Sequence, residues 1–136
     1  MKVIVDTCVW SAALRRSGFN DSDDIVNELK ELIREGRVQM IGPVRQELLS
    51  GIKNIEQFDK LRTMLSSFPD LVLQTQDYEK AADFYNKSRR KGVQGSNTDF
   101  LICAIAVNHF MSIFTTDNDF KLFKEHIPIK LHIPRL

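Results

Sequence analysis

Short apolar runs alternate with longer amphipathic segments along this chain. The runs that predict β-strands are Val3–Val5, Val38–Ile41, Leu71–Leu73, Ile113–Phe114 and Ile129–Ile133. Between them, apolar residues recur three or four positions apart, which is the spacing of a helix with one buried face. This spacing predicts helices at about 7–14, 20–36, 43–51, 55–68, 75–92, 99–107 and 120–125.

The order of these elements predicts an α/β fold. Strands that alternate with helices form a parallel sheet with helices on both faces. We therefore expect a three-layer α/β/α sandwich around a parallel sheet of about five strands, built as one domain over residues 1–136. The segment 99–107 is apolar on all sides, so its helix should be buried between layers.

Carboxylates follow two of the apolar runs. Asp6 comes directly after Val3–Val5, and Asp117 follows Ile113–Phe114 after two threonines. Ligands of open α/β sheets gather beyond the carboxyl ends of the strands. Asp99 opens the buried helix and Glu47 lies one turn into another, so we expect all four acids to converge at that edge of the sheet.

Four converging carboxylates call for a cation. Each raises the pKa of the others unless positive charge neutralises them, and an all-oxygen ligand set suits Mg²⁺ or Mn²⁺. A metal-activated water and a charge-neutralised phosphoryl group then predict phosphodiester hydrolysis without a covalent intermediate. Any single Asp after a strand is more often a helix cap, and Glu47 alone reads as a solvated surface residue.

Composition narrows the functional classes little. Lys and Arg number 19 against 18 Asp and Glu, so the net charge of +1 fits a neutral surface or an acidic pocket surrounded by scattered basic residues. Cys8 and Cys103 show no paired spacing, which favours reduced thiols and a cytoplasmic protein. The chain shows no leader and no apolar run long enough to cross a membrane, so we expect no membrane association.

Four motifs together resemble the PIN-domain ribonucleases, especially the VapC-like toxins of type II toxin–antitoxin systems. They are MKVIVDT at the start, RQELLSG in the middle, NTDFLICAIA later and IFTTDNDF near the end. The resemblance covers essentially the whole chain. It implies Mg²⁺- or Mn²⁺-dependent cleavage of RNA, a homodimer, and inhibition by a cognate antitoxin that occupies the active site.

The resemblance also assigns residues. It makes Asp6, Glu47, Asp99 and Asp117 both the catalytic and the metal-binding acids. Thr116 matches a position that is often Ser or Thr and is expected to orient a water or a carboxylate, or simply to cap the following helix. Thr7 has the same possible role, and Asp119 matches a position that is acidic in some relatives, as a further metal ligand or a supporting group.

Basic residues close to these acids are candidates for RNA contacts. They are Lys87, Arg89, Arg90 and Lys91 before Asp99, and Arg15 and Arg16 after Asp6. A solvated helix end stabilised by the helix dipole explains the first group equally well. Trp10 is expected in the core, or with Leu14 in a dimer or antitoxin groove, and none of the three histidines has the spacing of a metal ligand.

Proteins of other functional classes share this fold or also have acidic residues at strand ends. A housekeeping RNA-processing nuclease shares the fold and the acids, and a non-catalytic binding module shares the fold alone. A phosphoacceptor receiver domain needs an acidic pair after the first strand and a lysine after the fifth. This chain has Asp6 alone and ends its last strand with Pro134-Arg135, so the receiver function is excluded.

Overall fold

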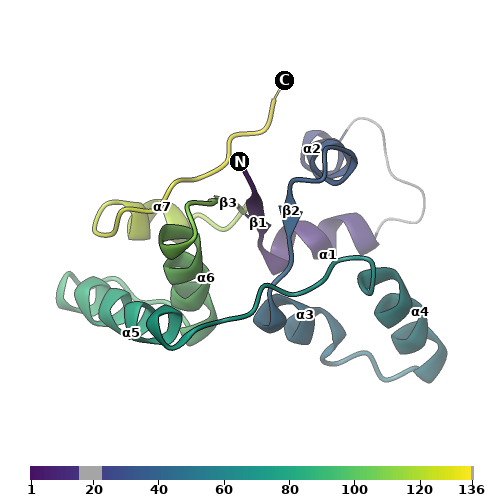
Figure 1. Cartoon of the computed structure of the whole chain (residues 1–136), viewed down its shortest axis with the longest axis horizontal. Coiled ribbons are helices and arrows are strands. Elements are labelled where there is room, and N and C mark those ends of the chain that lie inside the picture. Colours follow the sequence, from purple (N-terminus) through teal and green to yellow (C-terminus); the bar gives the residue numbers. More distant parts are fainter. Residues whose placement is uncertain (16–22, 136) are drawn as a thin grey trace.

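The computed structural model describes residues 1–15 and 23–135, and its elements follow the alternation expected from the sequence (Figure 1). In chain order they are β1 (Val3–Val5), α1 (Thr7–Arg15), α2 (Asp24–Arg34), β2 (Val38–Gln39), α3 (Gly42–Leu49), α4 (Ile55–Leu65), α5 (Thr75–Arg90), α6 (Asn97–Asn108), β3 (Ser112–Phe114) and α7 (Asp119–Lys124).

A parallel sheet forms the centre of the molecule. Its strand order is β2-β1-β3, with Val3 opposite Val38 on one side and opposite Ser112 on the other. Figure 1 shows the sheet between α5 and α6 on the left and α1 and α2 on the right. The expected α/β/α sandwich is therefore confirmed. All residues of β1 and β3 are buried, as continuous apolar runs in a covered parallel sheet should be.

Two of the five expected strands do not form. The segments 71–73 and 129–133 are not strands; each edge of the sheet instead carries one isolated parallel bridge, Met40 to Asp70 and Ile113 to Leu131. The second segment lies between Pro128 and Pro134, which lack the amide hydrogen that a longer ladder requires. The prediction of about five strands located the right segments but overestimated their pairing.

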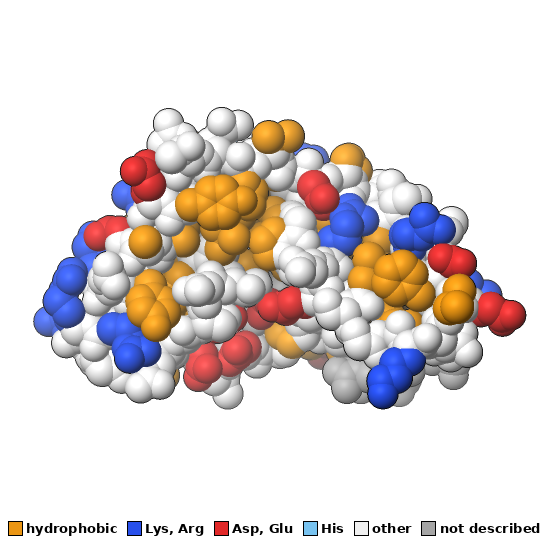
Figure 2. All heavy atoms as spheres, turned by 90° about the horizontal axis from the view of Figure 1, so that it is seen from below, with side chains coloured by type: hydrophobic (Ala, Val, Ile, Leu, Met, Phe, Trp, Pro, Cys, Tyr) orange, Lys and Arg blue, Asp and Glu red, His pale blue; other side chains and the backbone are white. Residues whose placement is uncertain are grey.

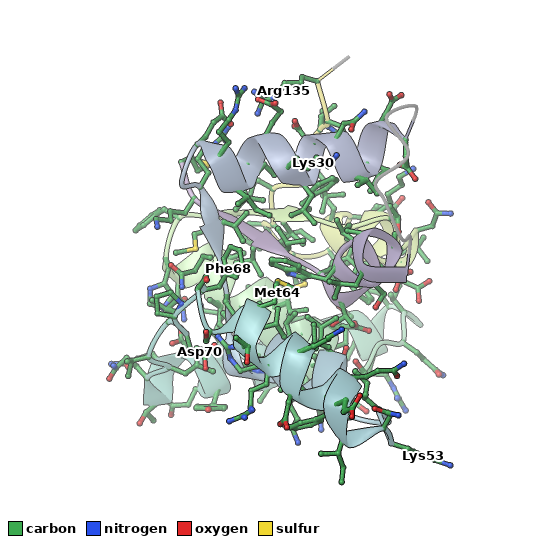
Figure 3. All side chains as sticks on the ribbon, turned by 90° about the vertical axis from the view of Figure 1, so that its right-hand side faces the viewer. Lys30, Lys53, Met64, Phe68, Asp70 and Arg135 are labelled. Atoms are coloured by element: carbon green, nitrogen blue, oxygen red, sulfur yellow. The ribbon has the colours of Figure 1, made fainter. Side chains whose placement is uncertain are left out.

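The helix α6 lies in the core, as its apolar sequence predicts. Its buried side chains include Phe100, Ile102 and Ile105, and α5 packs along it. The predicted burial of Trp10 is also confirmed, since only 2% of this residue is exposed. Its ring meets the edge of Phe68 at 5.2 Å between centroids. In Figure 3, Phe68 lies between α2 and the end of α4.

The last residues of the described chain are tied to α2 by a buried carboxylate. Glu28 is 2% exposed, and its Oε2 lies 2.6 Å from Nε2 of His132. The guanidinium of Arg135 lies 2.7 Å from Oε1 of Glu28 and also pairs with Glu35, above α2 in Figure 3. Glu28 thus finds its positive partners within the chain.

Candidate metal and nuclease site

Asp6 occupies the point where β1 ends and α1 begins. Its backbone carbonyl accepts the first helical bonds of α1, from the amides of Val9 and Trp10. Its side chain is held by the amide of Thr7, which donates to Oδ1 at 2.8 Å. Only 7% of Asp6 is exposed, and burial raises the pKa of this carboxyl, with the charge of Glu47 adding to the rise. No cation from the described part of the chain is paired with it.

Thr115 joins this carboxylate to the end of β3. Its hydroxyl donates to Oδ2 of Asp6 at 2.8 Å and accepts the amide hydrogen of Asp117 at 3.0 Å. The amide of Asp6 in turn donates to the carbonyl of Phe114 at 2.9 Å. One hydroxyl therefore fixes the positions of two acids from strands that are far apart in the sequence.

Cys8 lies at the same junction. Its sulfur is 3.5 Å from Oδ2 of Asp6 and 3.4 Å from the hydroxyl oxygen of Thr115. The hydroxyl of Thr116 donates to this sulfur at 3.3 Å, so the structure directs Thr116 toward Cys8. Among the residues described, Thr115 is the threonine on a site carboxylate at this strand end, and its role was missed in the sequence.

Glu47 approaches from α3. The hydroxyl of Thr7 donates to its Oε2 at 2.7 Å, which connects the start of α1 with α3. The helix starts at Gly42-Pro43, and proline at the first helical turn needs no hydrogen-bond partner for its nitrogen. Glu47 is exposed and close enough to Asp6 for its charge to raise the pKa of that carboxyl.

Asp99 is the third residue of α6 and forms a capping box. Its Oδ2 accepts the amide of Ser96 at 3.1 Å, while Ser96 Oγ accepts the amide of Asp99 at 3.0 Å. Burial raises the pKa of Asp99, and the charges of Asp6 and Asp117 raise it further against the hydrogen bonds from Ser96. Asp99 is therefore both a helix cap and a member of the acidic group.

Asp117 and Asp119 stand at the start of α7. Oδ1 of Asp117 accepts a hydrogen bond from the amide of Asp119 at 2.9 Å. Asp119 is therefore connected to the site through Asp117. Both residues are exposed. Figure 2, which views the molecule from the side below the sheet in Figure 1, shows acidic side chains gathered near the middle of this face.

The acids form a coupled group, and their chemistry fits a hard divalent cation. Asp6, Asp99, Asp117 and Glu47 all present carboxylate oxygens, and three of the pairings among them are close enough to raise a pKa. In the described part of the chain, no three His, Cys, Asp or Glu side chains are drawn together tightly enough to hold a metal ion as they stand.

The basic candidates lie at the end of α5. Arg89 donates to the hydroxyl of Tyr85 at 3.2 Å, and Lys87 pairs with Asp83 at 2.9 Å. Arg90 and Lys91 line a shallow cavity of 340 Å³ with Lys87 and residues after α7. Arg16 and the side chain of Arg15 lie outside the described residues.

Comparison with known proteins identifies the family. The PIN domain profile matches residues 3–125. This chain belongs to the PIN domain family. The search of curated protein sequences found no match. Within residues 1–15 and 23–135, no helix combines the length and the apolar character needed to cross a membrane.

Solved structures share the fold of this PIN domain at low identity. VapBC2 from Rickettsia felis, bound to a DNA fragment from its promoter, has a TM-score of 0.77 and 20% identity, over 97% of this chain and 98% of that one. FitAcB from Neisseria gonorrhoeae has a TM-score of 0.75 and 21% identity over 97% of both chains. A toxin–antitoxin complex from Klebsiella pneumoniae has a TM-score of 0.63 and 18% identity over 88% of this chain and 90% of that one.

Proposed function

We propose that this PIN domain is a divalent-metal-dependent endoribonuclease and the toxin of a toxin–antitoxin pair. The observation that supports the activity is the junction at which the Thr115 hydroxyl binds both the carboxylate of Asp6 and the amide of Asp117. Asp99 is close enough to both acids for their charges to raise its pKa. The toxin assignment is supported by the fold, which this chain shares with VapBC, FitAcB and a toxin–antitoxin complex.

Asp6, Asp99, Asp117 and Glu47 would hold Mg²⁺ or Mn²⁺, with Asp119 as a further candidate. A bound divalent ion supplies positive charge near the phosphoryl oxygens and makes a coordinated water more acidic. Neutralisation removes the repulsion among the acids, so we expect their side chains to move closer together when an ion binds. Thr7 and Thr115 keep Glu47 and Asp6 oriented through the bonds described above.

Basic residues that are near the acids in the sequence are candidates for substrate contacts. Arg89, Arg90 and Lys91, together with Arg15 and Arg16, are proposed to contact phosphates of single-stranded RNA. Thr116, next to Asp117, is proposed to assist in orienting water. We further propose a homodimer, a cognate antitoxin that covers the acidic site, and action in the cytoplasm, where the RNA substrate is.

A cleavage assay with purified protein tests the activity. With Mn²⁺ or Mg²⁺, the wild type should cut a single-stranded RNA, and Asp6→Asn and Asp117→Asn should lose about 100-fold or more, the scale of removing one transition-state electrostatic contact. Asp59→Asn, on exposed α4, is the matched control because it removes an equal charge away from the site. Equal cleavage by all four proteins would rule out this site.

A co-expression assay tests the toxin assignment. Expression of the wild type alone should arrest growth, and Asp6→Asn should not. The product of the neighbouring small reading frame should suppress the arrest. Normal growth with an active nuclease would favour a housekeeping enzyme of RNA processing.

A further inference from the structure

Gly95 lies in the segment that joins α5 to α6, and two aromatic rings lie close to its backbone. A methyl group on this residue would be 2.6 Å from Cζ of Phe123 and 2.9 Å from Cε2 of Phe100. Ordinary contacts of such a carbon begin at 3.4 Å, so the 2.6 Å distance is about 0.8 Å too short. The φ angle of Gly95 lies outside the left-handed region. Packing, rather than backbone conformation, therefore requires glycine here.

The two rings have no room to turn away from Gly95. Phe100 and Phe123 are both fully buried, and their centroids are 4.7 Å apart. Phe100 also meets the ring of Tyr85 on α5 at 5.5 Å, and Phe123 meets the ring of Phe120 at 5.1 Å. Because protein interiors are close-packed, an added methyl group would displace the joining segment or the helices that carry the rings.

The segment that contains Gly95 also orients the carboxylate of Asp99. The amide of Ser96, the next residue, donates to Oδ2 of Asp99 at 3.1 Å. The hydroxyl oxygen of Ser96 accepts the amide of Asp99 at 3.0 Å, and Phe100 directly follows Asp99 in α6. A shift of Gly95 would therefore move the group that holds this carboxylate.

The ring on the other side of the contact belongs to the helix that begins beside Asp117. Phe120 and Phe123 are the buried side chains of α7, and the amide of Phe120 donates to the carbonyl of Asp117 at 3.2 Å. This helix has only six residues and lies beside α6 in Figure 1. Its two buried rings therefore set its position. The contact of Gly95 with Phe123 thus connects the segment of Asp99 with the helix next to Asp117.

The separation of these two acids decides whether they can share an ion. The charge of Asp117 raises the pKa of Asp99, so the carboxylates repel each other and packing must oppose that repulsion. Mg²⁺ requires nearly ideal octahedral coordination at about 2.0–2.1 Å, and such a site needs its groups held within about 0.5 Å. A displacement of about 0.8 Å, the shortfall at Gly95, exceeds that tolerance.

We propose that Gly95 is a positioning residue of the metal site. Its lack of a side chain lets the segment before α6 lie against Phe123, and this contact sets the distance between Asp99 and Asp117. The proposal rests on the metal-dependent function proposed above and adds the packing contact that fits the site to a small ion. Gly95 and Phe123 act through the acids and do not touch the ion themselves.

Calorimetric titration with Mg²⁺ and Ca²⁺ tests this role. Gly95→Ala should weaken Mg²⁺ binding about tenfold, the scale of loss for groups that support metal ligands. The loss for Ca²⁺ should be smaller, because Ca²⁺ accepts longer and less regular coordination. Gly42→Ala, at the start of α3, is the matched control. A methyl group there meets no atom within 4 Å, so this variant should bind both ions as the wild type does.

A second substitution separates positioning from stability. Phe123→Leu removes the ring atoms nearest to Gly95, so the double variant Gly95→Ala/Phe123→Leu has room for the methyl group. It should recover most of the Mg²⁺ affinity lost in Gly95→Ala, whereas independent effects would add. Phe123→Leu alone leaves a gap and should also weaken Mg²⁺ binding. Phe84→Leu, which shortens a buried side chain of α5, should not. These two variants decide the question if Gly95→Ala does not fold.

Urea unfolding of the same proteins defines the opposite result. Wild-type affinity for Mg²⁺ in folded Gly95→Ala, with only its stability lowered, would assign Gly95 to packing alone and overturn the proposal. A double variant that binds Mg²⁺ more weakly than either single variant would also overturn it. Equal Mg²⁺ binding by the wild type and Asp6→Asn would show that the metal site itself is wrong, and this proposal with it.

Discussion

The helices α5 and α6 begin with the same local structure but place their acids in opposite surroundings. In each, the third residue is an aspartate that accepts the backbone amide of the cap residue: Gln74 to Asp77 at 2.9 Å, and Ser96 to Asp99 at 3.1 Å. Each bond satisfies one of the free amides at a helix start. In local sequence and local geometry, Asp77 and Asp99 therefore have the same helix-capping role.

Asp77 finds its hydrogen-bond partners within the chain. It is 1% exposed, and its Oδ1 accepts from the amide of Asn108 at 3.0 Å and lies 3.1 Å from Nε2 of His109. Burial alone would raise the pKa of Asp77, but the hydrogen bonds from Gln74, Asn108 and His109 outweigh it and lower the pKa. This carboxylate holds α5 to the end of α6.

Asp99 lies near other acidic residues, whereas Asp77 lies near hydrogen-bond donors. Beyond its cap, the charged groups that act on it are Asp6 and Asp117, and with burial they raise its pKa. The same capping motif therefore lies beside hydrogen-bond donors in one helix and beside negative charges in the other. We infer that the charges around a carboxylate, rather than its helix-capping motif, indicate whether it needs an external cation.

The largest expected effect separates the two acids by function. Asp99→Asn should lower RNA cleavage about 100-fold or more, because it removes a charge from the proposed metal site. Asp77→Asn should retain cleavage but lower the free energy of unfolding by about 2 kcal/mol, since it weakens hydrogen bonds to a buried charged group. Cleavage rates and urea unfolding of both variants measure this.

The contrast between the two acids requires that Asp99→Asn loses cleavage and Asp77→Asn loses stability, each without the other. Asn retains an oxygen that can accept the cap amide in both helices, so local capping is matched between the variants. Loss of cleavage in a well-folded Asp77→Asn protein would show that the contrast in surroundings has no functional meaning.

The sequence predicted much of the fold because the alternation of elements is a local signal. Asp6 and Asp117 could be found as acids that follow apolar runs, and the buried β1 and β3 confirm the strands themselves. The short pairing at 71–73 and 129–133 could not be predicted, because an edge strand is defined by partners far along the chain. Apolar residues there indicated burial but not a ladder.

The hydrogen-bond partners in the candidate site could not be predicted from the sequence for a related reason. Thr115 and Thr116 are adjacent and chemically equal, and only the path of the chain after β3 decides which hydroxyl reaches Asp6. Similarly, Asp77 and Asp99 follow possible caps, and the partners that distinguish them come from other elements. Spacing along one segment contains no information on those partners.

Divalent ions should stabilise the Asp77 and Asp99 variants to different extents. At a concentration 100 times its dissociation constant, Mn²⁺ should raise the free energy of unfolding of the wild type by about 2.7 kcal/mol. Asp77→Asn should gain the same amount, because its acidic site is intact, and Asp99→Asn should gain clearly less. Thermal unfolding of the three proteins with and without Mn²⁺ gives the three increments. Equal increments would mean that the ion binds elsewhere.

The smallest effect is the pH dependence of stability without metal, and it should have opposite signs for the two acids. The pKa of Asp77 is lowered from the ordinary value of 3.8, so its stabilising contribution is present above that value and is lost as the pH falls through the lowered one. The pKa of Asp99 is raised, so its contribution is greatest below 3.8 and is lost as the pH rises through the raised value. In EDTA, the wild type should therefore lose its advantage over Asp77→Asn on acidification, and gain stability relative to Asp99→Asn. Urea unfolding at a series of pH values from neutrality to below 3.8 measures both differences, and parallel trends would remove the electrostatic distinction between the two helix starts.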